Sequence, residues 1–132
     1  KGGNFLLNVG PTGKGVIPAP SVDRLNEVGA WLKVNGESIY GTGASPIGKP
    51  AWGRCTQKVT PAGTTLYLHV FDWPADGKLT VAGIKGRVVS ARLIANNQTL
   101  LTTMAAGGLT IALPATAPDK IASTIALVVD TK

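Results

Sequence analysis

The sequence contains few residues that could perform chemistry. It has one cysteine, Cys55, and one histidine, His69, among its 132 residues. A single cysteine excludes an intrachain disulfide and a cysteine-based metal site, and a lone histidine cannot supply a metal site. Cys55 is best interpreted as a small apolar residue of a strand. We therefore expect no metal and no cofactor in this segment.

Charge is also scarce, and most of it is positive. Charged residues make up 15% of the chain, with 13 Lys and Arg against seven Asp and Glu, which gives a net charge of +6. Only Lys85 and Arg87 lie close together, and no basic run alternates with aromatic residues as single-strand binders require. A solvated basic surface is the better explanation. We expect no nucleic-acid partner.

Long apolar runs are absent, although apolar residues are common. No stretch approaches the roughly 18 residues that would span a membrane, so we expect no membrane partner. The apolar fraction of 44% favours a folded segment over a disordered one. The length suffices for one domain with a core, but not for a complete (β/α)8 barrel of typically ~250 residues.

The first 42 residues follow the order strand, loop, helix. Residues 5–9 are apolar except for Asn8, a pattern that predicts a parallel strand buried on both faces. A loop rich in glycine and proline follows. Residues 21–34 then predict a helix, started by Ser21 or a nearby proline and ended by a left-handed Asn35-Gly36. Its apolar stripe consists of Val22, Leu25, Val28 and Leu32, with Trp31 beside it.

The rest of the chain predicts strands only. A linker of small residues over 43–52 separates residues 1–42 from residues 53–132. Short apolar runs separated by turn signals predict strands near 53–59, 64–71, 78–82, 87–95, 99–104, 108–113 and 121–130. Seven short strands at this spacing indicate a mainly β fold, an antiparallel β-sandwich. The order of elements predicts the last βα unit of one domain joined to an all-β domain.

Three segments resemble the α-L-fucosidases of glycoside hydrolase family 29. The first is Gly-Gly-Asn-Phe-Leu-Leu-Asn-Val-Gly-Pro over 2–11, followed by Gly-Val-Ile-Pro over 15–18. The second, over 25–42, holds Gly-x-Trp-Leu and Asn-Gly-Glu-x-Ile-Tyr-Gly-Thr. Both resemble the end of the family's catalytic barrel. The third, Leu-Tyr-Leu-His-Val-Phe-Asp-Trp-Pro over 66–74, resembles its C-terminal β-domain.

The resemblance implies a role for each part. Residues 1–42 would be the last βα unit of a truncated (β/α)8 barrel, and residues 53–132 the C-terminal β-sandwich. The parent protein would be a retaining glycosidase that removes terminal α-L-fucose from fucosylated glycans, with an Asp nucleophile and a carboxylate acid/base from earlier barrel strands. A periplasmic or extracellular location is also implied. No carboxylate here matches the family's catalytic motifs, so we assign no catalytic residue and expect the segment alone to be inactive.

Three residues are candidates for substrate binding. Asn8 precedes a loop on the face where such barrels build their active sites, although a hydrogen bond to loop backbone is the simpler role. Trp52 and Trp73 could stack on sugar rings, although packing is favoured over a sugar platform. The face formed by Tyr67, His69 and Phe71 is expected to pack against another layer.

Two other functions are compatible with the sequence. The first is an independent carbohydrate-binding β-sandwich module, and the second is a plain interaction domain. Self-association is a separate expectation: without the rest of a barrel, the apolar stripe and the strand at 5–9 would seek a substitute partner. We expect contact between copies to run through residues 1–40.

Overall fold

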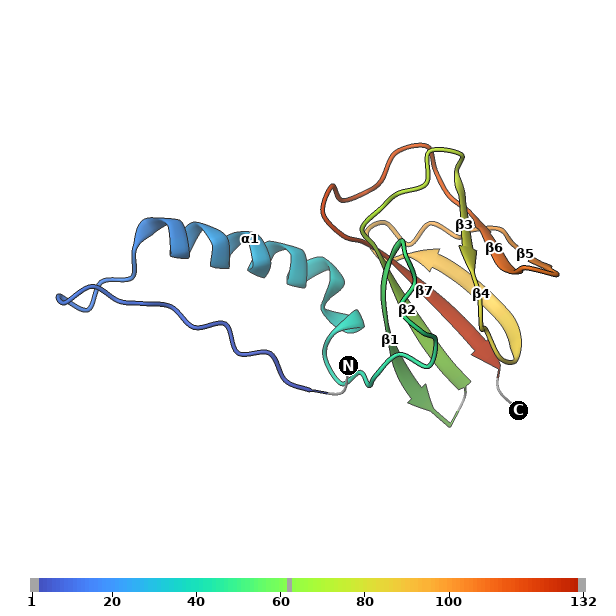
Figure 1. Cartoon of the computed structure of the whole chain (residues 1–132), viewed down its shortest axis with the longest axis horizontal. Helices are drawn as coiled ribbons and strands as arrows, with labels where there is room; N and C mark the ends of the chain where they lie inside the picture. Colours follow the sequence, from blue (N-terminus) through green and yellow to red (C-terminus); the bar gives the residue numbers. More distant parts are fainter. Residues whose placement is uncertain (1–2, 62, 131–132) are drawn as a thin grey trace.

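The computed structural model describes residues 3–61 and 63–130, and consists of one long helix followed by strands (Figure 1). The helical part is α1 (Ala19–Asn35) and the short 3-10 turn η1 (Gly36–Ser38). The strands are β1 (Gly53–Thr60), β2 (Gly63–Val70), β3 (Lys78–Val81), β4 (Arg87–Leu93), β5 (Thr102–Ala105), β6 (Gly108–Ala112) and β7 (Ser123–Asp130). Each of the predicted strands is present, with ends within three residues of those expected.

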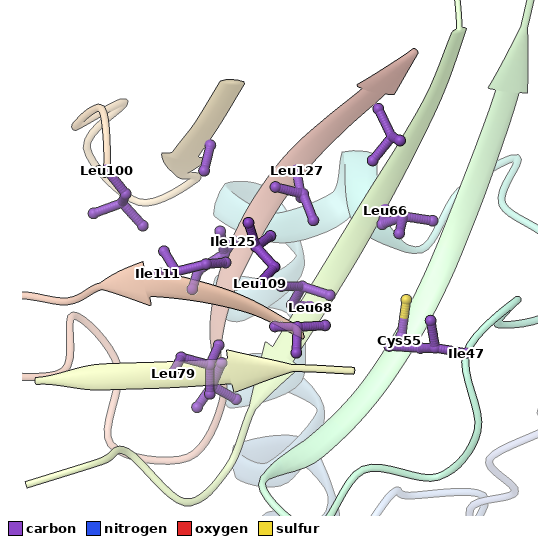
Figure 2. Packing of buried hydrophobic residues seen from close by; sticks show 14 of the residues in the cluster. Ile47, Cys55, Leu66, Leu68, Leu79, Leu100, Leu109, Ile111, Ile125 and Leu127 are labelled. Carbon is purple, nitrogen blue, oxygen red and sulfur yellow. The ribbon is translucent and has the colours of Figure 1, made fainter. Parts of the chain in front are cut away.

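The strands form two antiparallel sheets. One has four strands in the order β1-β2-β7-β4, and the other has three in the order β3-β6-β5. Apolar side chains from both sheets meet between them, as Figure 2 shows for Leu68, Leu79, Leu109, Ile111 and Ile125. Each of these five is at most 1% exposed. The predicted antiparallel β-sandwich is therefore confirmed.

The alternation along β2 decides which side chains enter this core. Leu66, Leu68 and Val70 point inward and belong to the core cluster, whereas Tyr67 and His69 lie on the outer face of the four-stranded sheet. Both outer residues are nevertheless only 5% exposed. A second layer must therefore cover this part of the sheet, as the sequence predicted for this face. Phe71, predicted to share that layer, is 48% exposed because it lies beyond the end of the strand.

The helix is longer than predicted and begins and ends differently. It starts at Ala19 after Pro18, so Ser21 lies inside the helix and does not cap it. Gly36 is right-handed (φ −57°, ψ −31°), and the chain continues into η1 before a left-handed glycine occurs at Gly41 (φ 68°). The predicted left-handed stop at Asn35-Gly36 is wrong, because Asn35 Nδ2 donates to the carbonyl of Trp31 and satisfies a helix-end acceptor directly.

Residues 5–9 are not a strand. The structure describes this segment as irregular and open to solvent, with Phe5 85% and Leu6 90% exposed. A parallel strand exists only by hydrogen bonding to its neighbours, and none of the strands in the described residues pairs with this segment. Together with α1, it extends away from the sandwich (Figure 1). No helix among the residues described is long and apolar enough to cross a membrane.

The segment predicted as a linker is held to the sandwich at two points. Gly43 pairs with Gln57 of β1 through reciprocal backbone hydrogen bonds of 2.7 and 3.2 Å. Ile47 enters the core cluster between the sheets (Figure 2). These two contacts fix the segment between η1 and β1 on the sandwich.

Candidate functional site

Any glycosidase would need carboxylates as acid and nucleophile, and five carboxylates of this chain are held in ion pairs or turn hydrogen bonds. Three are in ion pairs: Glu27 with Arg24, Glu37 with Arg92, and Asp130 with Arg87. Asp76 Oδ1 accepts the backbone N–H of Lys78, and Asp119 Oδ1 accepts those of Ile121 and Ala122. Asp76 therefore stabilises the turn that leads into β3. Within the described ranges, no group of three or more His, Cys, Asp and Glu could hold a metal ion.

Asn8 lies at a hollow between the first segment and the start of α1. The hollow has a volume of about 280 Å³ and is lined by Leu7, Asn8, Val9, Pro20, Ser21, Arg24 and Leu25. Asn8 itself is exposed. Its surroundings combine apolar side chains with one guanidinium group, an arrangement open on one side to further protein or to ligand.

Trp52 and Trp73 join the two sheets. The indole N–H of Trp52 donates to the carbonyl of Thr80 at 3.0 Å, and that of Trp73 donates to the carbonyl of Pro114 at 3.0 Å. Trp52 and Trp73 flank the β1–β2 hairpin, whereas Thr80 lies in β3 and Pro114 follows the end of β6. Both rings are half-buried and pack against the core cluster. Packing is thus part of the role of each tryptophan.

One of these two tryptophans also borders a hollow. It has a volume of about 340 Å³ and is lined by Ile47, Gly48, Lys49, Pro50, Ala51, Trp52, Thr80, Val81 and Ala82. Its only charged lining residue is Lys49. Neither Asn8 nor Trp73 lines this hollow. The three candidate binding residues are therefore not brought into one site.

The layer over the outer face of β2 is the C-terminal end of α1. Trp31 Nε1 donates to the carbonyl of Ala122 at 2.8 Å, and its ring lies 6.2 Å from the His69 ring at an interplanar angle of 40°. Thr56 Oγ1 donates to the carbonyl of Ser38 at 2.6 Å. We call this contact between α1, η1 and the four-stranded sheet the helix–sheet joint.

Sequence reasoning missed most of the helix–sheet joint. It placed Trp31 beside the apolar stripe and expected a layer over His69, but the two residues lie 38 positions apart and nothing in either segment pairs them. Glu37 and Arg92 form an ion pair of 2.6 Å across the same joint. A tryptophan in the last turns of the helix, beside the apolar stripe, was the one signal present.

Burial causes the pKa shifts of His69 and Tyr67 in the joint and of Cys55 in the core. Desolvation lowers the pKa of His69 to about 4, so this ring is neutral near pH 7. Burial raises the pKa of Tyr67, and the nearby Glu37 carboxylate adds to that rise while Arg92 opposes it. Burial also raises the pKa of the Cys55 thiol, which keeps it protonated in the core.

Comparisons with known proteins agree on one family. The family model for α-L-fucosidase matches residues 1–37. The α-L-fucosidase of Dictyostelium discoideum is 43% identical over 81 residues, which are 61% of this chain and 17% of that protein. The chain thus spans a small part of this relative.

Solved structures extend the likeness to nearly the whole chain. The α-L-fucosidase isoenzyme 1 from Paenibacillus thiaminolyticus matches with a TM-score of 0.83 and 41% identity, covering 96% of this chain and 31% of that one. A glycoside hydrolase family 29 α-L-fucosidase from Bacteroides thetaiotaomicron shares the fold, with a TM-score of 0.80 at 22% identity over 91% of this chain and 27% of that one.

The helix followed by a two-sheet sandwich is therefore an arrangement that this chain shares with part of solved α-L-fucosidases. More particularly, the chain matches the C-terminal portion of the α-L-fucosidases of glycoside hydrolase family 29 in sequence and in fold.

Proposed function

We propose that this chain is the C-terminal accessory segment of a retaining α-L-fucosidase that removes terminal α-L-fucose from glycans. Residues 1–42 would complete the catalytic barrel, the sandwich from residue 53 would brace it, and 43–52 would connect them. Substrate would bind in the barrel, and the catalytic carboxylates would come from other parts of the protein. The family resemblance also leads us to propose a periplasmic or extracellular location.

One observation carries this proposal: the match to an α-L-fucosidase covers 96% of this chain but 31% of the matched chain, at 41% identity. The exposed apolar surface supports the same role. Leu6, Val16 and Val28 are 90%, 60% and 40% exposed, all in the part that would adjoin a barrel. Apolar surface gathered on one side of a protein marks a site of contact with further protein.

Hydrolysis of an aryl α-L-fucoside tests the proposal. We expect no turnover by residues 1–132, and turnover by a longer chain that carries the upstream barrel of the same protein. In that longer chain, we expect Asn8→Ala to lower kcat/KM, and unchanged kinetics would remove Asn8 from the candidate site. Asn26→Ala is the matched control, because Asn26 is an exposed residue of α1. Turnover by residues 1–132 alone would contradict the accessory role and direct attention to the carboxylates of this chain.

An independent carbohydrate-binding module is the second candidate, and the hollow beside Trp52 is the observation that favours it. Titration of the chain with L-fucose or a fucosylated oligosaccharide, followed by the indole N–H signals of its three tryptophans, tests this candidate. Movement of the Trp52 signal alone in the wild type, together with loss of calorimetrically measured sugar binding in Trp52→Ala, would support sugar binding there. Unchanged indole N–H signals at millimolar sugar would mean that Trp52 and Trp73 have packing roles only.

We also propose that the isolated chain self-associates through residues 1–40. Sedimentation of the wild-type chain and of Leu6→Asp tests this, because Leu6 is 90% exposed in that region. Leu101→Asp is the matched control, since Leu101 is 79% exposed on the sandwich. We expect Leu6→Asp alone to shift the chain toward monomer, and a monomeric wild type would contradict the proposal.

A further inference from the structure

His69 stands at the centre of the helix–sheet joint, with a hydroxyl group at each ring nitrogen. Thr56 Oγ1 lies 3.3 Å from Nε2, and Thr124 Oγ1 lies 3.5 Å from Nδ1. The Trp31 ring lies at 6.2 Å. With 5% of its surface exposed, the imidazole has these contacts in place of water.

The hydrogen bonds of Thr56 assign the tautomer of this imidazole. Thr56 has one hydroxyl proton, and it is donated to the carbonyl of Ser38 at 2.6 Å. Toward His69, Thr56 Oγ1 can only accept, so Nε2 carries the proton. Nδ1 is then the acceptor for the hydroxyl proton of Thr124. The neutral ring therefore has a donor and an acceptor matched to its two neighbours.

Protonation would break this match, because Nδ1–H would face a hydroxyl oriented to donate. The sheet would also bring cations near the new charge. Arg54 of β1 is directly opposite His69 in the β1–β2 register and holds its own contact with the carbonyl of Gly53. Arg92 of β4 lies on the same outer face, two strands along through Tyr67 and Ala126.

The carboxylates around the joint have other partners. Glu37, which η1 brings to this layer, accepts from Arg92. Asp119, in the loop that Trp31 contacts, accepts from the backbone of that loop. Lys33 in the last turn of α1 is exposed and adds positive charge, and the neighbours on β7 and β2 are Thr124 and the neutral Tyr67. These neighbours supply no counter-charge free to receive an imidazolium.

We propose that the helix–sheet joint is an acid-sensitive latch: protonation of His69 releases Trp31 and the end of α1 from the sandwich while the sandwich stays folded. The latch is separate from the fucosidase assignment and holds whether or not the parent hydrolyses fucosides. The sandwich is unaffected because its own core, between the sheets, contains no titrating group other than the protonated Cys55 thiol.

The lowered pKa of His69 fixes the range in which the latch responds. Neutral His69 is retained in the docked joint down to about pH 4, whereas a solvent-exposed imidazole protonates near its ordinary value of 6.5. Acid therefore favours the undocked state progressively from about pH 6.5 downward. Between pH 6.5 and 4 the docking equilibrium should weaken by on the order of a hundredfold.

The chain's three tryptophans allow this to be measured with an internal control. Each indole N–H is bonded to a named carbonyl: Trp31 to Ala122 across the joint, Trp52 to Thr80 and Trp73 to Pro114 within the sandwich. Hydrogen exchange of the three indoles is followed by NMR at pH 6.5 and 4, corrected for intrinsic exchange rates. The same samples give the titration of His69 without assignment, since it is the only histidine.

We expect the protection factor of Trp31 to fall on the order of a hundredfold, with those of Trp52 and Trp73 unchanged. The matched variant His69→Gln has a neutral donor that cannot titrate, and its Trp31 protection should be flat over the same range. Loss of protection at all three indoles together would overturn the latch in favour of global unfolding. Retained Trp31 protection through the protonation of His69, or an equal fall in His69→Gln, would also overturn it.

Discussion

The two regions of this molecule contain similar apolar side chains and place them very differently. In the sandwich, Leu68, Leu93 and Leu127 are completely buried. In the N-terminal arm, defined here as residues 3–35, Phe5 and Leu6 are 85% and 90% exposed, and Leu25 of the helical stripe is 37% exposed. The sandwich buries its largest aliphatic side chains between its own two sheets, whereas the apolar side chains of the arm largely remain exposed in this chain.

The comparison shows which elements depend on their surroundings. The helix of the arm forms because its hydrogen bonds are internal, and α1 is regular although its stripe is uncovered. The strand expected at 5–9 does not form, since strand hydrogen bonds must be made to another strand. Only the C-terminal end of α1 packs against the sandwich, through the helix–sheet joint.

The largest contrast should come from truncating one leucine in each region. Leu68→Ala removes a fully buried side chain between the sheets, and should lower the free energy of unfolding by about 2–5 kcal/mol. Leu25→Ala, at a residue 37% exposed, should cost less than about 1 kcal/mol in this chain. Urea unfolding followed by near-UV circular dichroism measures both. Equal losses would mean that α1 is packed more tightly than its exposure indicates.

Acid should destabilise the joint next most strongly. The pKa of His69 is lowered from 6.5 to about 4 by folding, so the unfolded chain binds a proton first as the pH falls. The stability that the neutral ring contributes to the docked joint is present above pH 6.5 and is lost as the pH falls to about 4, by at most about 3 kcal/mol in total. Unfolding free energies of wild type and His69→Gln, measured at several pH values, isolate this loss. Parallel curves for the two proteins would show that carboxylates alone account for the acid sensitivity.

Alanine substitution at two glycines should change stability in opposite directions. A Cβ at Gly53, where β1 pairs with β2, would lie 1.9 Å from the carbonyl oxygen of His69, and Gly53→Ala should cost about 1–3 kcal/mol. At Gly29, inside α1, no atom lies within 4 Å of an added Cβ. Gly29→Ala should raise helix stability by about 0.5–1 kcal/mol, because alanine is the better helix former. Thermal unfolding of both variants tests this, and destabilisation by Gly29→Ala would point to a contact on that face of α1.

The fold could be predicted from local pattern to a large extent. Short apolar runs separated by turn signals located the seven strands, because strand and turn propensities are local properties. The helix was predicted from its period, but its termini were not: Ser21 and Gly36 have the residue types of caps, yet the joint decided where α1 ends. Side-chain contacts made at the end of an element override intrinsic cap preferences there.

The candidate site was less predictable, because its contacts join distant segments. Trp31 and Ala122 are 91 residues apart, and Trp73 and Pro114 are 41 apart. No period or spacing in a single sequence connects such pairs. A tryptophan signals a large surface to bury and one donor to satisfy. Which carbonyl receives that donor depends on the packing of the complete sandwich, as it does for Trp52 and Thr80.

The smallest expected effect concerns the ion pair that spans the two regions. Glu37 and Arg92 are joined at 2.6 Å, but their side chains are 42% and 36% exposed, so solvent and salt weaken the attraction. Glu37→Gln should therefore cost about 0.2–1 kcal/mol at low salt and less at 1 M NaCl. The matched control is Glu27→Gln, whose partner Arg24 lies within α1, so that no contact between regions is lost. Measured by urea unfolding followed by tryptophan fluorescence, a loss well above 1 kcal/mol in Glu37→Gln would mean that the pair orients η1 on the sheet and is not merely a surface contact.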